Sequence, residues 1–314
     1  GVPLKEEPRV KQEPGVDESP DSGGTEAAGI RSEQDDPGYR AFLRRVSMDL
    51  VGPTLESVEG HTGAVVAIDL DTDFPFGATI QDKRPTTVLE FWCLEFPGHS
   101  KDGRAPLELW CDGGGEFMGE FQEYCARNGI RILRTLPNLP QTNAKEERFH
   151  DTLGGSIRTC ILYAGGPLRF WSYCFRHVLV HFACVPRKPG QQDPYTRRHG
   201  HKSTRVLVPW GCRALFHRTK DEAERYEHRG AEGVILCYAG LGGYEVLDFQ
   251  HYVNTKGGVR TVVTRDLVIH PEAFPFRELE ETHPEHRLWT FTLLAVGRSD
   301  ADWRVDGKGR ILCF

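Results

Sequence analysis

The sequence predicts an α/β fold in which helices flank a mixed sheet, with a disordered tail before it and a small β-rich segment after it. Three observations lead to this prediction. Strand and helix patterns alternate through residues 41–185, which is typical of a layered α/β domain. Short β-type runs with glycine turns fill much of residues 231–278 and indicate a small SH3-like barrel or curled sheet. Residues 1–38 are rich in Pro, Glu, Gly, Ser and Asp.

The acidic character of the 314-residue chain lies in its tail. Residues 1–38 hold ten acids and four bases, a net charge of -6 that equals the net charge of the whole chain. A segment of this composition cannot bury enough apolar surface to offset its ordering entropy, so we expect a disordered acidic linker. The remainder is about neutral, and the acidic pI does not argue against an anionic partner.

The pattern along residues 39–185 gives the order of the elements. Three strands come first, and helices then alternate with two more strands before two final helices. Pro85 is typical of a helix start, and Asn128-Gly129 of a helix end. Residues 137–143 are expected to form a loop. The expected strands span residues 44–52, 63–70, 74–80, 105–111 and 130–136, and the expected helices span residues 85–96, 116–129, 144–164 and 168–184.

The rest of the chain divides by charge and glycine content. Residues 186–230 hold eleven bases and five acids, and we interpret them as a basic connector. The small β-rich domain would span residues 231–278. Residues 279–314 contain one possible strand, at 288–297, and stay unassigned.

Composition excludes two classes of protein. Nine cysteines with no CxxC pair argue against a disulfide framework. No apolar run approaches the length needed to cross a bilayer, so no membrane partner is expected. The chain opens on Gly without a signal peptide, and we interpret it as a fragment of a longer product.

Carboxylates at strand ends and helix starts are the candidate functional residues. Asp112 ends the strand in "LELWCDGGGEF", Asp49 ends the first strand in "SMDLVGP", and Glu146 and Glu147 open the helix after residue 143. Three ionised carboxylates about 4 Å apart repel by ~4 kcal/mol per pair at an effective dielectric near 20. Such a cluster persists only around cations, and hard oxygen ligands suit Mg²⁺ or Mn²⁺.

Helix geometry favours Glu147 over Glu146 as the third ligand. Glu146 lies in line with the apolar stripe that includes Phe149 and Leu153, whereas Glu147 lies about 100° around the helix. A metal ligand should border a solvent-filled groove rather than continue a core face.

The three glycines after Asp112 could also suggest a phosphate-binding loop. That alternative fails, because no Gly-Lys-Ser/Thr follows them.

Three blocks of the sequence resemble the catalytic blocks of retroviral-type integrases. They are "MDLVGP", "WCDGGGEFMGEF" and "LPNLPQTNAKEERFHDTL", and they are most similar to copia-type retrotransposon polyproteins. Asp112 and Glu147 are 35 positions apart, similar to the family's interval. Residues 208–270 also resemble the segment downstream of the core in copia polyproteins. Gly113 stands where the family usually has Asn, and Ala144-Lys145 where it often has Gly and a small apolar residue.

The resemblance implies a ribonuclease H-like catalytic core over residues 39–185. It implies two Mg²⁺ or Mn²⁺ ions held by Asp49, Asp112 and Glu147. The implied reactions are 3′-end processing of the element's DNA and strand transfer into target DNA, both in-line phosphoryl transfers. The implied partners are element and target DNA and further copies of the chain. The implied location is the nucleus, after an earlier cytoplasmic particle.

Basic residues around this core are candidates for contacts with DNA phosphates. Lys145 and Arg148 flank Glu147. The basic stretch adds Arg187, Lys188, Arg197, Arg198, Lys202 and Arg205. A solvated basic surface is the alternative interpretation of the same stretch.

Two further clusters are interpreted as structural. "DLDTD" at 69–73 lacks the Gly and Glu of a calcium loop, and we expect a solvated strand end there. Cys174, His177, His181 and Cys184 share one helix face, but one helix cannot wrap a tetrahedral ion, so we expect packing residues.

Two alternatives to the integrase hypothesis stay open. One is a decayed or co-opted copy that binds DNA or partners without cutting. The other is a ribonuclease H-like nuclease that hydrolyses DNA without joining it.

Overall fold

The computed structural model describes residues 42–134, 140–217, 230–289, 303–305 and 311–313. In the helix that begins at residue 140, side chains are described from Glu147 onward. The linker expected at residues 1–38 therefore lies outside the described residues. None of the helices described is both long and apolar enough to span a bilayer.

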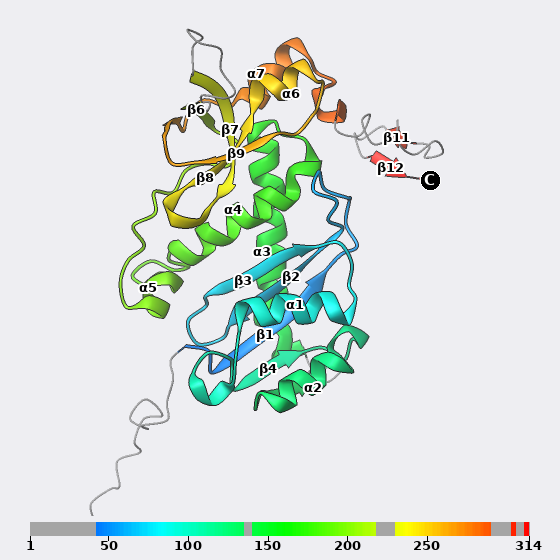
Figure 1. Ribbon diagram of the computed structural model, residues 1–314, viewed down its shortest axis with the longest axis vertical. Helices are drawn as coiled ribbons and strands as arrows, with labels where there is room; N and C mark the ends of the chain where they lie inside the picture. The colour runs from blue at the N-terminus through cyan, green and yellow to red at the C-terminus, as the bar shows by residue number, and fades with distance from the viewer. Residues whose placement is uncertain (1–41, 135–139, 218–229, 290–302, 306–310, 314) are drawn as a thin grey trace, which may run out of the picture. The chain divides into compact units, whose positions relative to one another are not determined.

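A five-stranded mixed sheet carries the N-terminal half of the described chain (Figure 1). The two neighbours of β1 differ in direction: β2 is antiparallel to it and β4 parallel. The β2–β3 pair is antiparallel and the β4–β5 pair parallel. The mixed sheet predicted from the sequence is confirmed, and helices cover both of its faces (Figure 1). The strand order is β3 (Pro75–Ile80), β2 (Gly63–Asp69), β1 (Arg45–Val51), β4 (Glu108–Cys111), β5 (Arg131–Arg134).

Burial on both faces explains the apolar runs of the central strands. All seven residues of β2 are buried. Val65 and Ala67 belong to one apolar core, which also holds Val46, Met48 and side chains of α1 (Pro85–Glu95) and α2 (Glu120–Arg127). Val66 and Ile68 point the other way, into a core shared with α3 (Pro140–Ala164) and α4 (Trp171–Cys184). Because alternate residues face opposite cores, a strand between two helical layers reads as a continuous apolar run.

The helices begin and end close to the predicted residues, with two corrections. α1 (Pro85–Glu95) and α4 (Trp171–Cys184) agree with the prediction. α2 (Glu120–Arg127) begins later than expected, because Gly119 has φ 58 and ψ -123 and a short 3-10 turn precedes it. α3 (Pro140–Ala164) begins at Pro140, so the loop predicted up to residue 143 is wrong for its last four residues. Proline is well suited to a first helical position, because it has no N–H to leave unpaired.

A second, antiparallel sheet follows the core. Its first strand, β6, lies in the stretch predicted as a basic connector, and residues 218–229 between β6 and β7 lie outside the described residues. The expected closure into an SH3-like barrel stays a prediction. The strand order is β10 (Leu267–His270), β6 (Arg213–His217), β7 (Gly230–Tyr238), β8 (Tyr244–Asp248), β9 (Thr261–Thr264). The remaining elements are α5 (Pro194–His199), α6 (Phe249–Asn254), α7 (Pro275–Thr282), β11 (Trp303–Val305) and β12 (Ile311–Cys313).

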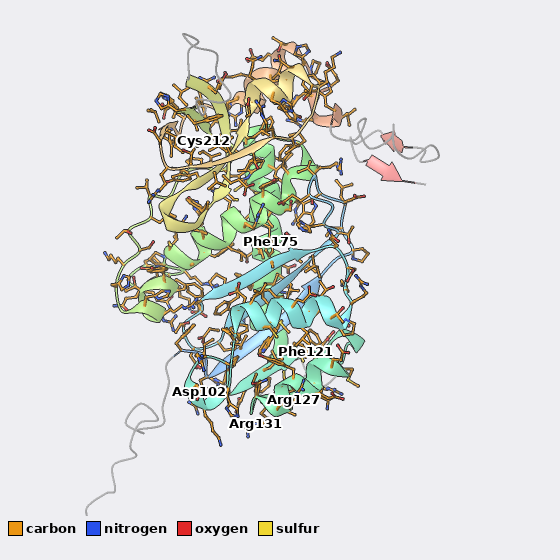
Figure 2. The ribbon with its side chains drawn as sticks, viewed as in Figure 1. Asp102, Phe121, Arg127, Arg131, Phe175 and Cys212 are labelled. Atoms are coloured by element: carbon orange, nitrogen blue, oxygen red, sulfur yellow. The ribbon has the colours of Figure 1, made fainter. Side chains whose placement is uncertain are left out.

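Helix α4 joins the two sheets. It packs against β3 of the mixed sheet and against β7 of the antiparallel sheet (Figure 1). Phe175, labelled in Figure 2, lies against Gly77 of β3, where an added Cβ would come 2.9 Å from its ring. Gly77 therefore lets the helix approach the sheet closely.

The histidines of α4 are packing residues, as the sequence predicted. His177 is buried, and its Nε2 lies 3.0 Å from the Val208 carbonyl oxygen, to which it donates. Its ring stacks on His181 and on Tyr238, each at a centroid distance of 4.7 Å. Burial lowers the pKa of His177 to about 3, so the ring is neutral in the folded protein at neutral pH.

The expectation of a solvated strand end at residues 69–73 is wrong. Asp69 is fully buried. Its carboxylate accepts hydrogen bonds from the backbone N–H groups of Leu43, Asp71 and Thr72 at 2.7–3.2 Å. Burial nevertheless raises its pKa. The carboxylate thus closes the turn after β2 and ties it to residue 43, just ahead of β1.

Part of the segment left unassigned packs on the end of α3. His286 is buried, and its Nε2 lies 3.0 Å from the Gly165 carbonyl oxygen. Tyr252 of α6 donates to the His286 carbonyl oxygen, and Trp289 is buried nearby. Residues 286–289 are helical, so the possible strand at 288–297 is wrong for its first two residues. Residues 290–297 lie outside the described part of the chain.

The pKa of His177 predicts a loss of stability in mild acid. In the unfolded chain His177 takes up a proton near pH 6.5, whereas in the folded chain it does so only near pH 3. As the pH falls below 6.5, proton uptake therefore favours the unfolded chain, and the free energy of unfolding decreases. Between pH 7 and pH 5 the free energy of unfolding should fall by about 2 kcal/mol more in the wild type than in His177→Gln. Urea titrations at both pH values measure this difference. Equal losses in the two proteins would contradict the account.

Candidate active site

The register between β1 and β4 brings two candidate carboxylates together. Arg45 lies opposite Glu108, and Ser47 opposite Trp110. Both pairs differ by 63 positions, as do Asp49 and Asp112. The paired residues end at Ser47 and Trp110, and the same register continued by two residues would set Asp112 beside Asp49. Neighbouring strands lie about 4.8 Å apart.

Asp49 is on the face of the sheet that α3 and α4 cover. It lies opposite Val66 of β2, whose side chain belongs to the α3–α4 core. Leu109 and Cys111 of β4 belong to the other core, and Asp112 follows directly after the last residue of that strand. The meeting of Asp49, Asp112 and Glu147 at one site stays a prediction.

Local donors hold the two aspartates in their present orientations. Asp49 Oδ1 accepts from the Leu50 N–H at 2.7 Å, and its side chain is 38% exposed. Asp112 is exposed, and its Oδ1 accepts from the Gly114 N–H at 2.9 Å. An aspartate that accepts from the backbone two residues on forms an Asx turn, which shapes the chain as it leaves β4.

The three glycines after Asp112 are not required by backbone conformation. None of them has a positive φ, unlike Gly119. A Cβ added at Gly113 or Gly115 would meet no atom within 4 Å, and one at Gly114 would meet only the Glu116 carboxyl group. The turn therefore tolerates side chains, and the Gly113 departure from the integrase pattern does not distort it.

The third carboxylate comes from α3, which His150 ties to β1. Glu147 is exposed, and its side chain is the first one described in α3. His150 lies one turn further on, on the same side of the helix, and its Nδ1 is 3.4 Å from Asp49 Oδ2. This contact places the start of α3 over the strand that carries Asp49. His150 was not among the residues predicted from the sequence, although its spacing of three from Glu147 was a usable signal.

The chemistry of His150 is set by burial. Burial lowers the pKa of His150, although Asp49 and Asp151 act in the opposite direction. The ring is therefore neutral, and the carboxylate beside Nδ1 favours the tautomer with the proton on that nitrogen. Nε2 is then an acceptor, and it is buried without a hydrogen-bond partner among the described residues.

The described residues do not form a complete metal site. No group of three His, Cys, Asp or Glu side chains in these residues is placed to hold a metal ion, and Asp49, Asp112 and Glu147 are all among them. Asp49 and Asp112 each accept a hydrogen bond from a nearby backbone N–H.

Four of the arginines predicted to bind DNA are engaged within the chain. Arg187 lies over Phe149, with its guanidinium carbon 4.9 Å from the ring centroid, and Arg197 pairs with Asp73 at 2.8 Å. Their contacts anchor the segment after α4 to α3 and to the turn between β2 and β3. The other two are Arg198, which lies over Phe42, Phe74 and Phe76, and Arg205, which donates to the Ala239 carbonyl oxygen.

The other candidates for DNA contact are more open. Arg148, Lys188 and Lys202 are exposed, and the side chain of Lys145 lies outside the described residues. Contact of the eight basic residues with DNA stays a prediction.

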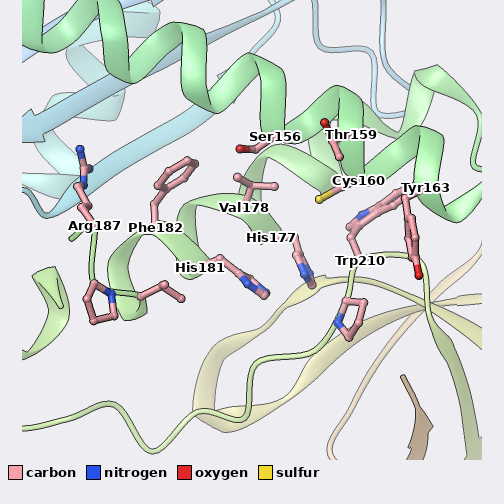
Figure 3. Close-up of a pocket in the computed structure, with 13 residues that line it drawn as sticks. Ser156, Thr159, Cys160, Tyr163, His177, Val178, His181, Phe182, Arg187 and Trp210 are labelled. Atoms are coloured by element: carbon pink, nitrogen blue, oxygen red, sulfur yellow. The ribbon is translucent and has the colours of Figure 1, made fainter. Parts of the chain in front are cut away.

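Two cavities adjoin α3. The larger, of about 450 Å³, lies between α3, α4 and the segment around Trp210, and Figure 3 shows Cys160, His177, Phe182 and Arg187 among its lining residues. It contains none of the three candidate carboxylates. The smaller, of about 290 Å³, is lined by His150 and lies next to Asp49.

In sequence the chain is similar to a retrotransposon polyprotein. The chain is 27% identical over 201 residues to the "Retrovirus-related Pol polyprotein from transposon TNT 1-94" of Nicotiana tabacum. The match covers 63% of this chain and 15% of the polyprotein, so the chain spans only a small part of that relative. No protein-family model matches the chain.

Comparison with solved structures finds integrase cores at low overall similarity. The catalytic core domain of BIV integrase has a TM-score of 0.39 and 17% identity, covering 49% of this chain and 91% of that one. The HTLV-2 integrase catalytic core domain, solved with magnesium, has a TM-score of 0.39 and 12% identity, covering 50% and 97%.

The glycine run supplies a matched pair of substitutions. Gly113→Asn, which restores the residue usual in the integrase pattern, should change the free energy of unfolding by less than about 0.5 kcal/mol. Gly119→Asn should lower it by about 1–3 kcal/mol, because the backbone there has φ 58 and ψ -123, a conformation in which a side chain is strained. Urea unfolding of both variants measures the difference, and a costly Gly113→Asn would refute this description of the turn.

Proposed function

We propose that this chain is the integrase core of a copia-type retrotransposon, which cuts and joins DNA by phosphoryl transfer at Asp49, Asp112 and Glu147. The observation that carries the proposal is the parallel pairing of β1 with β4, because the same register continued to the ends of both strands would set Asp49 beside Asp112. The sequence similarity to a retrotransposon Pol polyprotein supports it.

The donor set fits divalent cations. Three carboxylates from two adjacent strands and one helix offer only hard oxygen ligands, which suit Mg²⁺ or Mn²⁺ rather than softer metals. In the proposal Asp49, Asp112 and Glu147 hold two such ions. Two bound ions would stabilise both the attacking and the leaving oxygens of a phosphodiester exchange.

The chain itself supplies position and charge. Asp49 lies within a strand that is hydrogen-bonded on both sides, so its backbone is rigidly held. Asp112 lies in a turn, and Glu147 on an exposed helical turn, so these two carboxylates can rotate toward a shared ion at little cost. His150 contacts Asp49 from α3 and limits how far its carboxylate can turn. Positioning of this kind is the main protein contribution to phosphoryl transfer.

The partners in this proposal are DNA and further copies of the chain. Element ends and target DNA would contact the exposed bases Arg148, Lys188 and Lys202, together with Lys145. Joining two element ends to one target needs an active site at each end, which calls for at least two copies. Joining to chromosomal DNA would take place in the nucleus.

A strand-transfer assay tests the proposal. The chain is incubated with a short DNA duplex as donor, a plasmid as target, and Mg²⁺ or Mn²⁺. Joined product should form, and Asp49→Asn, Asp112→Asn and Glu147→Gln should each lower its rate by at least about 100-fold, since even partners of metal ligands cost 10–100-fold. Glu146→Gln is the matched control, because it removes the neighbouring charge and should leave the rate within about threefold.

Other outcomes select the alternatives. Cut DNA without joined product would replace the integrase with a nuclease. DNA binding that is unchanged by metal and by all four substitutions, with neither cut nor joined product, would identify a non-catalytic copy.

A further inference from the structure

We infer that the smaller cavity beside Asp49 is a pocket for a single unstacked nucleobase of the DNA strand that the site acts on. The inference rests on the proposed function, because it names where the nucleotide next to the reacting phosphate would go. The cavity lies between α3, the first turn of α4 and the loop after β1.

Continuity with the candidate active site is the first argument. Val51 lines the cavity, and Asp49 lies two residues earlier on the same face of β1. His150 belongs to both places: its Nδ1 is 3.4 Å from Asp49 Oδ2, and its ring lines the cavity. A nucleotide adjoining a phosphate held at Asp49 therefore has the cavity directly beside it.

The lining is suited to an aromatic heterocycle. The cavity is about 290 Å³ and mostly apolar, with the aromatic side chains of Trp171 and Phe175 in its wall. This volume is at the lower end of the range for small-molecule pockets, which suits one base. The Trp171 indole is held in place because its Nε1 donates to the Leu55 carbonyl oxygen at 2.6 Å. Enzymes that bind unstacked bases place them against such side chains.

The polar groups match a nucleotide rather than a plain apolar ligand. The His150 ring lines the cavity, and its Nε2 is buried with no hydrogen-bond partner among the described residues. Arg158 lines the cavity and is exposed, so its positive charge is available to the phosphate that follows the base. None of the described residues that line the cavity is acidic.

Two adjacent glycines of α3 allow the cavity to be filled selectively. Gly154 lines it, and a Cβ there would meet only the Arg158 guanidinium, at 3.6 Å. A Cβ at Gly155 would meet nothing within 4 Å, and Gly155 does not line the cavity. Phenylalanine at either position is more favourable in a helix than glycine, so Gly154→Phe and Gly155→Phe should both fold, and only the first fills the cavity.

The test measures whether one base contributes to binding through this cavity. Dye-labelled blunt duplexes with a 3′-dideoxy end, which cannot be joined, are titrated with the full chain in Mg²⁺ by fluorescence anisotropy. In separate duplexes the base is removed from the last, second-last or third-last nucleotide of one strand. At one position, loss of the base should weaken binding to the wild type and to Gly155→Phe by about tenfold, the effect expected for one stacked base. Gly154→Phe should bind the intact duplex about tenfold more weakly, and loss of the base should then change nothing.

Each other result decides between the two proposals. The inference is overturned if no position shows an effect of base removal, if the effect is the same in Gly154→Phe, or if no duplex is bound. It is also overturned if Gly154→Phe changes only the oligomeric state, because the cavity would then receive a second copy. If the base effect depends on Gly154 and yet no joined product forms with Mg²⁺ or Mn²⁺, the pocket stands and the integrase proposal fails. If joined product forms and base removal has no effect, the integrase proposal stands and the pocket fails.

Discussion

The parallel pairing of β1 with β4 is the constraint on which the rest of the site depends. A parallel pair needs a long connection, and here that connection contains β2, β3 and α1. It therefore brings together residues that are 63 positions apart. The pairing also fixes direction, since both strands present the same face to α3 at the same level. One slip of register would turn Asp49 or Asp112 toward the opposite core, and two-face burial of the strands prevents that slip.

Sequence patterns predicted the core better than its surroundings. The apolar runs of β1 to β5 are long enough to be recognised, and their alternation with helices indicated a mixed sheet. The start of α3 was predicted four residues late, because Pro140 was interpreted as part of a loop, although proline suits a first helical position. The antiparallel sheet was predicted only in part, because β6 lies among basic residues that looked like a connector.

The sequence pattern points to the candidate carboxylates and not to the residues that pack around them. Asp49 and Asp112 stand out because each ends an apolar strand, a pattern visible in one dimension. The positions of His150, Trp171 and the cavity follow from how α3 and α4 pack over β1. A local sequence pattern does not predict that packing. Asp69 was misjudged for the same reason. A carboxylate at a strand end looks solvated until the chain that covers it, with its N–H donors, is placed.

A basic stretch of sequence does not show whether its side chains face solvent or pack within the fold. Arg187, Arg197, Arg198 and Arg205 belong to a basic stretch, yet each guanidinium has a partner within the fold, in a carboxylate, a carbonyl or an aromatic ring. An arginine can bury its stem and stack its planar head, so a run of bases does not by itself mark a surface for DNA. The exposed bases nearest Glu147 and the cavity beside Asp49 are the more informative features of the site.

Anomalous diffraction from crystals soaked in Mn²⁺ measures the central claim most directly. The account predicts Mn²⁺ peaks between Asp49 and Asp112, with carboxylate oxygens about 2.1 Å away and Glu147 turned toward the same ions. The aspartates would then have left the Leu50 and Gly114 N–H groups. Saturating Mn²⁺ with no peak there, and with both aspartates still on those N–H groups, would contradict it.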